Sequence, residues 1–116
     1  MYIILYLLSC AEDCFSLGGG YGDADISAIR FACESDGGKR CKGDFIEKKT
    51  AFCILEDIEN IELDESVYTI DANIYYDDGH KGVVWSIGYW PHGSVLGVVH
   101  LYIDAIEGTA YARTPY

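Results

Sequence analysis

The C-terminal half of the chain decides the fold: Ser66 to Tyr116 reads SVYTIDANIYYDDGHKGVVWSIGYWPHGSVLGVVHLYIDAIEGTAYARTPY. Its first part, from Val67 to Tyr76, alternates with the period of two that puts an apolar face on one side of a pleated strand. Three more runs are rich in β-branched and aromatic residues, as strands are. They are Val83 to Trp90, Val95 to Asp104 and Thr109 to Thr114.

Short connections join these runs. Asp78-Gly79 lies at the centre of the first turn, and Pro91 to Gly93 interrupts the second run. Asp-Gly favours a hairpin turn, proline cannot donate to a sheet ladder, and glycine adopts positive φ without strain. Gly108 follows the third run in the same way. The sequence therefore predicts a four-stranded antiparallel meander.

One strong amphipathic helix is predicted, from Asp44 to about Glu59. Asp44 can cap its free N–H groups, Glu47 can complete a capping box, and Asn60 suits a left-handed stop. Its apolar stripe needs burial, and the meander offers the only large apolar face. We therefore expect an α+β fold with one main helix packed on a curved sheet. The stripe contains Phe45, Ala51, Ile54, Leu55 and Ile58.

Residues 1–24 are expected to be a lipoprotein signal and flexible tether, and residues 25–116 a single domain. Leu7-Leu8-Ser9-Cys10 ends an apolar run and resembles a bacterial lipobox, in which the cysteine is lipidated. Ala11 to Ser27 is glycine-rich, which is typical of a tether. No Lys or Arg precedes the apolar run, so a buried first strand and a cytoplasmic location form the alternative. Ile26 to Glu34 is either a helix capped by Asp25 or a strand.

The chain has five cysteines. If Cys10 is lipidated, four remain, which allow three pairings that the sequence cannot choose among. Cys33 and Cys41 could close a short loop; the alternative is that the thiols are reduced. The absence of a Cys-x-x-Cys pair and the scattered histidines disfavour a zinc site, and no metal or cofactor is expected. The other two cysteines are Cys14 and Cys53.

The net charge of −11 is unevenly distributed. Between Ile54 and Glu107 there is one lysine, Lys81, against eleven Asp and Glu, a net charge of −10. Such a surface repels phosphate backbones, so nucleic-acid binding is disfavoured. The same charge would attract a basic protein, although it would also serve solubility alone.

Three segments resemble a known family. Lys48 to Ala51 (KKTA), Val84 to Gly93 (VWSIGYWPHG) and Gly97 to Asp104 (GVVHLYID) are similar to motifs of small bacterial immunity proteins with a nuclear-transport-factor-like fold. Tyr102-x-Asp104-x-x-x-Gly108 is also similar to PepSY-type domains. The chain departs from the family in having the single glycine Gly97 where a pair is frequent.

The resemblance implies a cystatin-like or nuclear-transport-factor-like fold and a protein that binds and neutralises a cognate secreted toxin. The alternatives are a PepSY-like envelope domain that restrains a peptidase and a small-ligand-binding domain. No catalytic motif is present, so an enzyme is not expected. Trp85 is predicted to be core. Aromatic residues beside carboxylates suit a protein interface, and the predicted partner-binding residues are Tyr75, Asp77, Asp78, Tyr89, Trp90 and His92.

Overall fold

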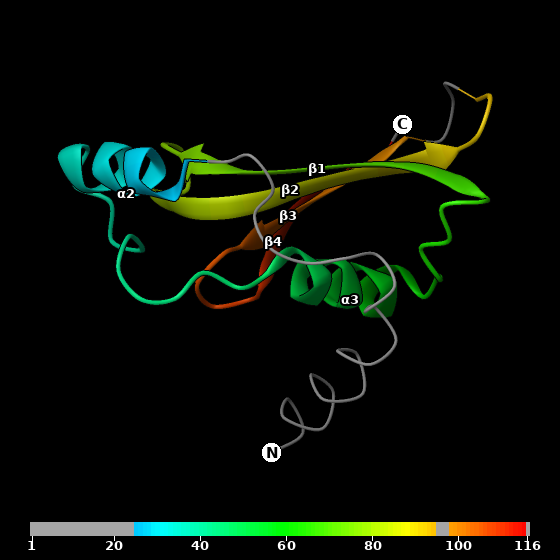
Figure 1. Cartoon of the computed structure of the whole chain (residues 1–116), viewed down its shortest axis with the longest axis horizontal. Coiled ribbons are helices and arrows are strands. Elements are labelled where there is room, and N and C mark those ends of the chain that lie inside the picture. The colour runs from blue at the N-terminus through cyan, green and yellow to red at the C-terminus, as the bar shows by residue number, and fades with distance from the viewer. Residues whose placement is uncertain (1–24, 95–97, 116) are drawn as a thin grey trace, which may run out of the picture.

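The computed structural model describes residues 25–94 and 98–115. Within these ranges two helices pack with a four-stranded antiparallel sheet of order β1-β2-β3-β4 (Figure 1). The predicted α+β class and antiparallel meander are confirmed. The predicted signal and tether, with Cys10 and Cys14, lie outside the described residues. In the part of the chain that the structure describes, no helix is long and apolar enough to cross a bilayer.

The four strands are close to their predicted positions. They are β1 (Tyr68–Asp77), β2 (Gly82–Pro91), β3 (Val99–Asp104) and β4 (Ala110–Pro115). β1 and β2 pair over their full length, from Tyr68↔Pro91 to Asp77↔Gly82. The register of β3 and β4 shifts between Tyr102 and Ile103, where one strand carries an extra residue. The third strand begins at Val99, four residues later than predicted, and 95–97 are not described.

The main helix, α3 (Lys48–Glu59), lies under one face of the sheet. The predicted start at Asp44 and the capping box are wrong: the N-cap is Glu47, without a side-chain cap. Ile46 explains this, because its N–H donates to the Ala105 carbonyl (2.7 Å) and its carbonyl accepts from Trp85 Nε1 (2.9 Å). These bonds hold the chain extended against the sheet until Glu47. The helix ends at Asn60, which is left-handed (φ 57°) as predicted.

The core lies between α3 and the sheet. Trp85, Leu55, Ile87 and Ile103 are fully buried there, and the prediction for Trp85 is confirmed. Each large apolar side chain buried in this way stabilises the fold by about 1.5–3 kcal/mol. Ile58 is 47% exposed and does not belong to the buried stripe, whereas Phe52 and Cys53 do.

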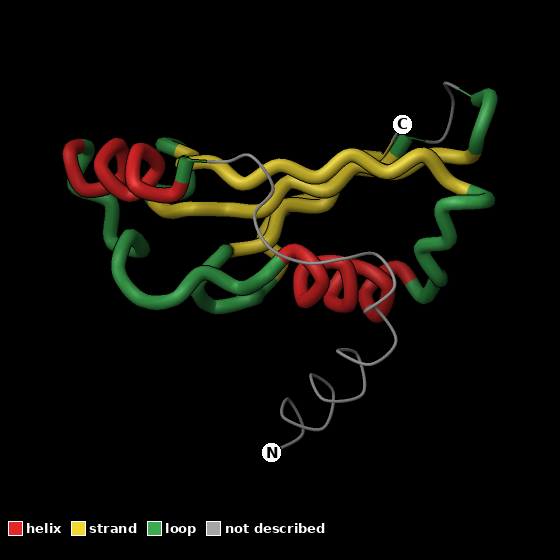
Figure 2. Tube along the Cα trace, viewed as in Figure 1, coloured by secondary structure: helices red, strands yellow, loops and turns green. Residues whose placement is uncertain are grey.

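A second helix, α2 (Ile26–Ser35), lies beside the end of the sheet where β1 meets β2 (Figure 2). It is the helical alternative left open for Ile26 to Glu34, and Asp25 caps it by accepting from the Ala28 N–H (3.1 Å). A disulfide joins Cys33 to Cys41 and ties the helix to the following loop. The Tyr76 hydroxyl donates to Asp36 (2.6 Å) and links this end of the molecule to β1.

Candidate protein-binding surface

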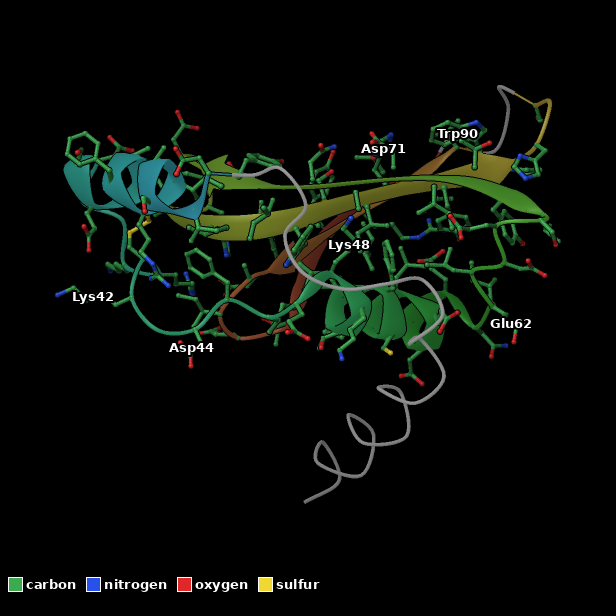
Figure 3. All side chains as sticks on the ribbon, viewed as in Figure 1. Lys42, Asp44, Lys48, Glu62, Asp71 and Trp90 are labelled. Atoms are coloured by element: carbon green, nitrogen blue, oxygen red, sulfur yellow. A yellow bond between two sulfur atoms is a disulfide. The ribbon has the colours of Figure 1, made fainter. Side chains whose placement is uncertain are left out.

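The sheet face that points away from α3 is not covered by any helix that the structure describes (Figure 2). Register places alternate residues of each strand on this face, opposite to Ile74, Trp85 and Ile103 in the core. We call it the open face. Figure 3 shows Asp71 and Trp90 projecting from it, away from α3. Its members on β1 to β3 are Thr69, Asp71, Asn73, Tyr75, Asp77, Val84, Ser86, Gly88, Trp90, His100, Tyr102 and Asp104, of which Val84 and Asp104 are buried.

Aromatic rings gather on the open face. Tyr75 is 37% exposed. The rings of His100 and Tyr102 are stacked with centroids 6.5 Å apart, and Tyr111 lies 6.3 Å from Tyr102. The His100 ring lies over Gly88, where a Cβ would come within 2.6 Å of Cε1. The glycine therefore lets the ring lie flat on the sheet, and the surface offers broad aromatic area.

Two tyrosines of this region are held as neutral phenols. Partial burial, followed by the negative charge of Asp77, raises the pKa of Tyr75. The pKa of Tyr111 is raised well above its usual range by burial and by its hydrogen bond to Asp77. Both hydroxyls therefore remain hydrogen-bond donors over the whole physiological pH range.

Asp77 and Asp78, the two predicted turn carboxylates, have different surroundings. Asp77 accepts hydrogen bonds from the Gly79 N–H (2.9 Å) and the Tyr111 hydroxyl (2.7 Å). Asp78 is exposed. Asp77 therefore organises the turn, and Asp78 is the carboxylate presented to solvent.

Tyr89 was predicted to bind the partner, and the structure corrects its placement. It lies on the α3 face, is 7% exposed, and its hydroxyl donates to Glu59 (2.7 Å). It has the same strand parity as Trp85, so alternation places both side chains in the core. Burial and the hydrogen bond to Glu59 raise the pKa of Tyr89, so the phenol stays protonated beneath the sheet.

His92 is exposed beside the open face, in the loop after β2. Its Nε2 lies 2.7 Å from the Glu65 carbonyl and its Nδ1 lies 3.0 Å from the Thr69 hydroxyl. A carbonyl can only accept, so Nε2 carries a proton, and a neutral ring accepts from Thr69 at Nδ1. His92 is thus a positioned loop residue at the end of the open face.

Sequence reasoning missed a cluster around Asp104, which is 1% exposed. Its Oδ2 lies 2.7 Å from His80 Nε2 and 3.2 Å from Arg40 Nε. Arg40 also lies 3.4 Å from Glu107, and its buried Nε makes no well-directed hydrogen bond within the described residues. The sequence signal for this cluster is Asp104 itself, a single aspartate at the end of an apolar strand and just before a glycine turn.

The Asp104 cluster connects two turns. Asp104 Oδ1 accepts from the Ile106 and Glu107 N–H groups, while His80 stacks on Tyr111 with ring centroids 3.9 Å apart. Within residues 25–94 and 98–115, His80 has no hydrogen bond to a serine, threonine or cysteine that it could activate as a nucleophile. The same ranges hold no group of three His, Cys, Asp or Glu able to bind a metal. The contacts that the cluster does make fasten the two turns to each other.

Comparisons of the chain with protein-family models, with curated proteins and with solved structures find no match.

Proposed function

We propose that this chain is an immunity protein that binds and neutralises a cognate, basic protein toxin through the open face. The observation that carries the proposal is the gathering of Tyr75, Trp90, His100 and Tyr102 beside Asp71 on a face that no described helix covers. Aromatic side chains supply most of the binding energy at tight interfaces. The resemblance of three segments to immunity-protein motifs supports the same function.

The charge distribution specifies the kind of partner. The net charge of −10 between Ile54 and Glu107 includes Asp71 on the open face and Asp78 beside it. Negative groups facing a basic surface accelerate association and exclude acidic competitors. A toxin with a basic surface is therefore the partner that this surface would select.

The proposal includes a cystatin-like or nuclear-transport-factor-like arrangement for the domain. The packing of α3 against one face of a four-stranded meander supports it. It also includes a lipidated Cys10 in the cell envelope. The Cys33–Cys41 disulfide supports that compartment, because disulfides persist in oxidising environments. Metabolic labelling with a fatty acid should mark the membrane fraction of the wild type and not that of Cys10→Ala. Equal labelling of both would exclude this anchor.

Co-expression with the proteins encoded next to this gene tests the function. One of them should be toxic alone and form a stable one-to-one complex with this chain. Trp90→Ala should accelerate dissociation, with a cost of about 2 kcal/mol. Asp78→Lys should slow association and weaken its salt dependence, while Asp57→Lys on the exposed side of α3 should change neither. If no neighbouring product binds, and none is toxic, the proposal fails.

A further inference from the structure

The two edges of the sheet differ. β4 is a six-residue edge that ends at Pro115 and pairs with β3 through a register shift. Proline and bulges are the features that protect an edge from pairing with another strand. β1 is a ten-residue edge with neither proline nor glycine. β1 is therefore the edge able to accept a further strand.

The hydrogen-bond pattern shows which groups of β1 point outward. The Val67 carbonyl, just before the strand, accepts from the His92 N–H (3.1 Å). Bonded residues alternate along an antiparallel pair, so odd-numbered residues of β1 bond to β2. The N–H and C=O groups of Ile70, Ala72 and Ile74 consequently point away from β2. No backbone partner among the described residues faces them.

A pocket of about 290 Å³ lies along this edge between β1 and α3. Ile70 and Ala72 face it from the strand, and Phe52 from the helix. A strand added to β1 would place alternate side chains over this pocket and the others beside Asp71 on the open face. The complete lining is Lys48, Phe52, Glu65, Ile70, Asp71 and Ala72.

The charged side chains of β1 indicate which kind of strand could pair with this edge. β1 carries two charged side chains, Asp71 and Asp77, and no basic one. If a second copy paired in antiparallel register about Ile74, each Asp71 would face an Asp77, and like charges opposite each other are destabilising. Lys or Arg opposite Asp71 would be favourable. The edge therefore suits a basic segment of another protein and disfavours a second copy of this chain in that register.

We propose that β1 is a strand-addition site for an extended, basic segment of a partner protein. The segment alternates Lys or Arg, beside Asp71, with residues that lie over the pocket and meet Ile70, Ala72 and Phe52 there. Main-chain hydrogen bonds to Ile70, Ala72 and Ile74 provide the attachment, and the alternate side chains provide the specificity. The inference rests on the proposed function in that this segment belongs to the toxin.

A capped peptide of about ten residues that alternates lysine and valine is the probe. In an antiparallel pairing that places a valine opposite each of Ile70, Ala72 and Ile74, the valine N–H groups face β1. The peptide should slow hydrogen exchange of the Ile70, Ala72 and Ile74 amides at least about tenfold. N-methylation of the valines should abolish this protection, and N-methylation of the lysines should preserve it. No protection up to millimolar peptide, or equal effects of the two methylations, would overturn the inference.

Ala72→Pro provides the matched variant. Proline at position 72 removes an N–H that points outward and makes no hydrogen bond to β2. An edge strand tolerates proline at such a position, so the fold should persist. The variant should lose peptide protection and bind the toxin at least about tenfold more weakly, whereas Asp57→Lys should not. A toxin that binds wild type and Ala72→Pro equally would refute strand addition and leave the proposed function intact. If the peptide pairs with β1 but no toxin partner is found, strand addition is supported and the proposed function fails.

Discussion

His80 and Asp104 form a contact of 2.7 Å between Nε2 and Oδ2, and this pair fastens the β1–β2 turn to the β3–β4 turn. The buried Asp104 carboxylate is shared by His80, Arg40 and the N–H groups of the following turn, so removing it leaves these groups without their acceptor. Asp104→Ala should therefore lower the free energy of unfolding by about 3 kcal/mol in urea denaturation. Glu107→Ala, at the exposed side of the same cluster, should cost less than about 1 kcal/mol. Equal costs would show that burial of Asp104 does not govern the cluster.

Gly88 should tolerate a side chain only if His100 is absent. In Gly88→Ala the new Cβ would meet the imidazole at 2.6 Å, so the ring must leave its place on the open face. The expected cost is about 1–3 kcal/mol, as for other overpacked sites. In a His100→Ala background the same substitution should cost little. A cost that is unchanged by His100→Ala would place the strain elsewhere.

Glu59 should make stability depend on pH. Hydrogen bonds from Arg113, at 2.7 and 2.9 Å, are the main cause that lowers the pKa of Glu59 from its usual 4.5. A carboxylate with a depressed folded-state pKa stabilises the fold above its unfolded pKa. This contribution is lost as the pH falls through the folded-state pKa. Glu59→Gln should therefore flatten the acid limb of the stability curve in urea unfolding, and Asp57→Asn should leave it unchanged.

The Cys33–Cys41 disulfide closes a loop with a sequence separation of 8 residues, and the loop carries Arg40 to Asp104. For a loop of that size the constraint on the unfolded chain is worth about 2–3 kcal/mol. Replacing both cysteines by serine should lower the free energy of unfolding by that amount. Arg40→Ala should then cost less than it does with the disulfide intact. Additive effects would mean that the disulfide does not position Arg40.

Local patterns were sufficient for part of the structure. Alternation from Val67 to Tyr76 predicts β1, and Asn60 predicts the end of α3, because both depend on neighbours in the chain. The start of α3 depends on the bond between Ile46 and Ala105, which are far apart in sequence, so the capping pattern of Asp44 and Glu47 was misleading. The His80–Asp104 contact likewise spans 24 residues, and no local signal specifies it.

The open face was partly predictable as well. Strand position predicts that Tyr75 and Trp90 lie on this face, and alternation alone excludes Tyr89 from it, since Tyr89 shares the parity of Trp85. The separate roles of Asp77 and Asp78 could not be predicted from the sequence, because they depend on which residues the fold brings close to Asp77. Tyr111 reaches Asp77 only because β4 returns beside β3 with an extra residue at the register shift.

The unequal edges of the sheet have a consequence for assembly. A fibre that grows by edge pairing needs two complementary edges on every subunit, so that each addition creates a new site for the next. Here β1 is the long, regular edge, whereas β4 is short and ends at Pro115. A strand added to β1 leaves this molecule with no equivalent edge on its other side. A strand bound at β1 would therefore end the sheet at this molecule and would not extend it.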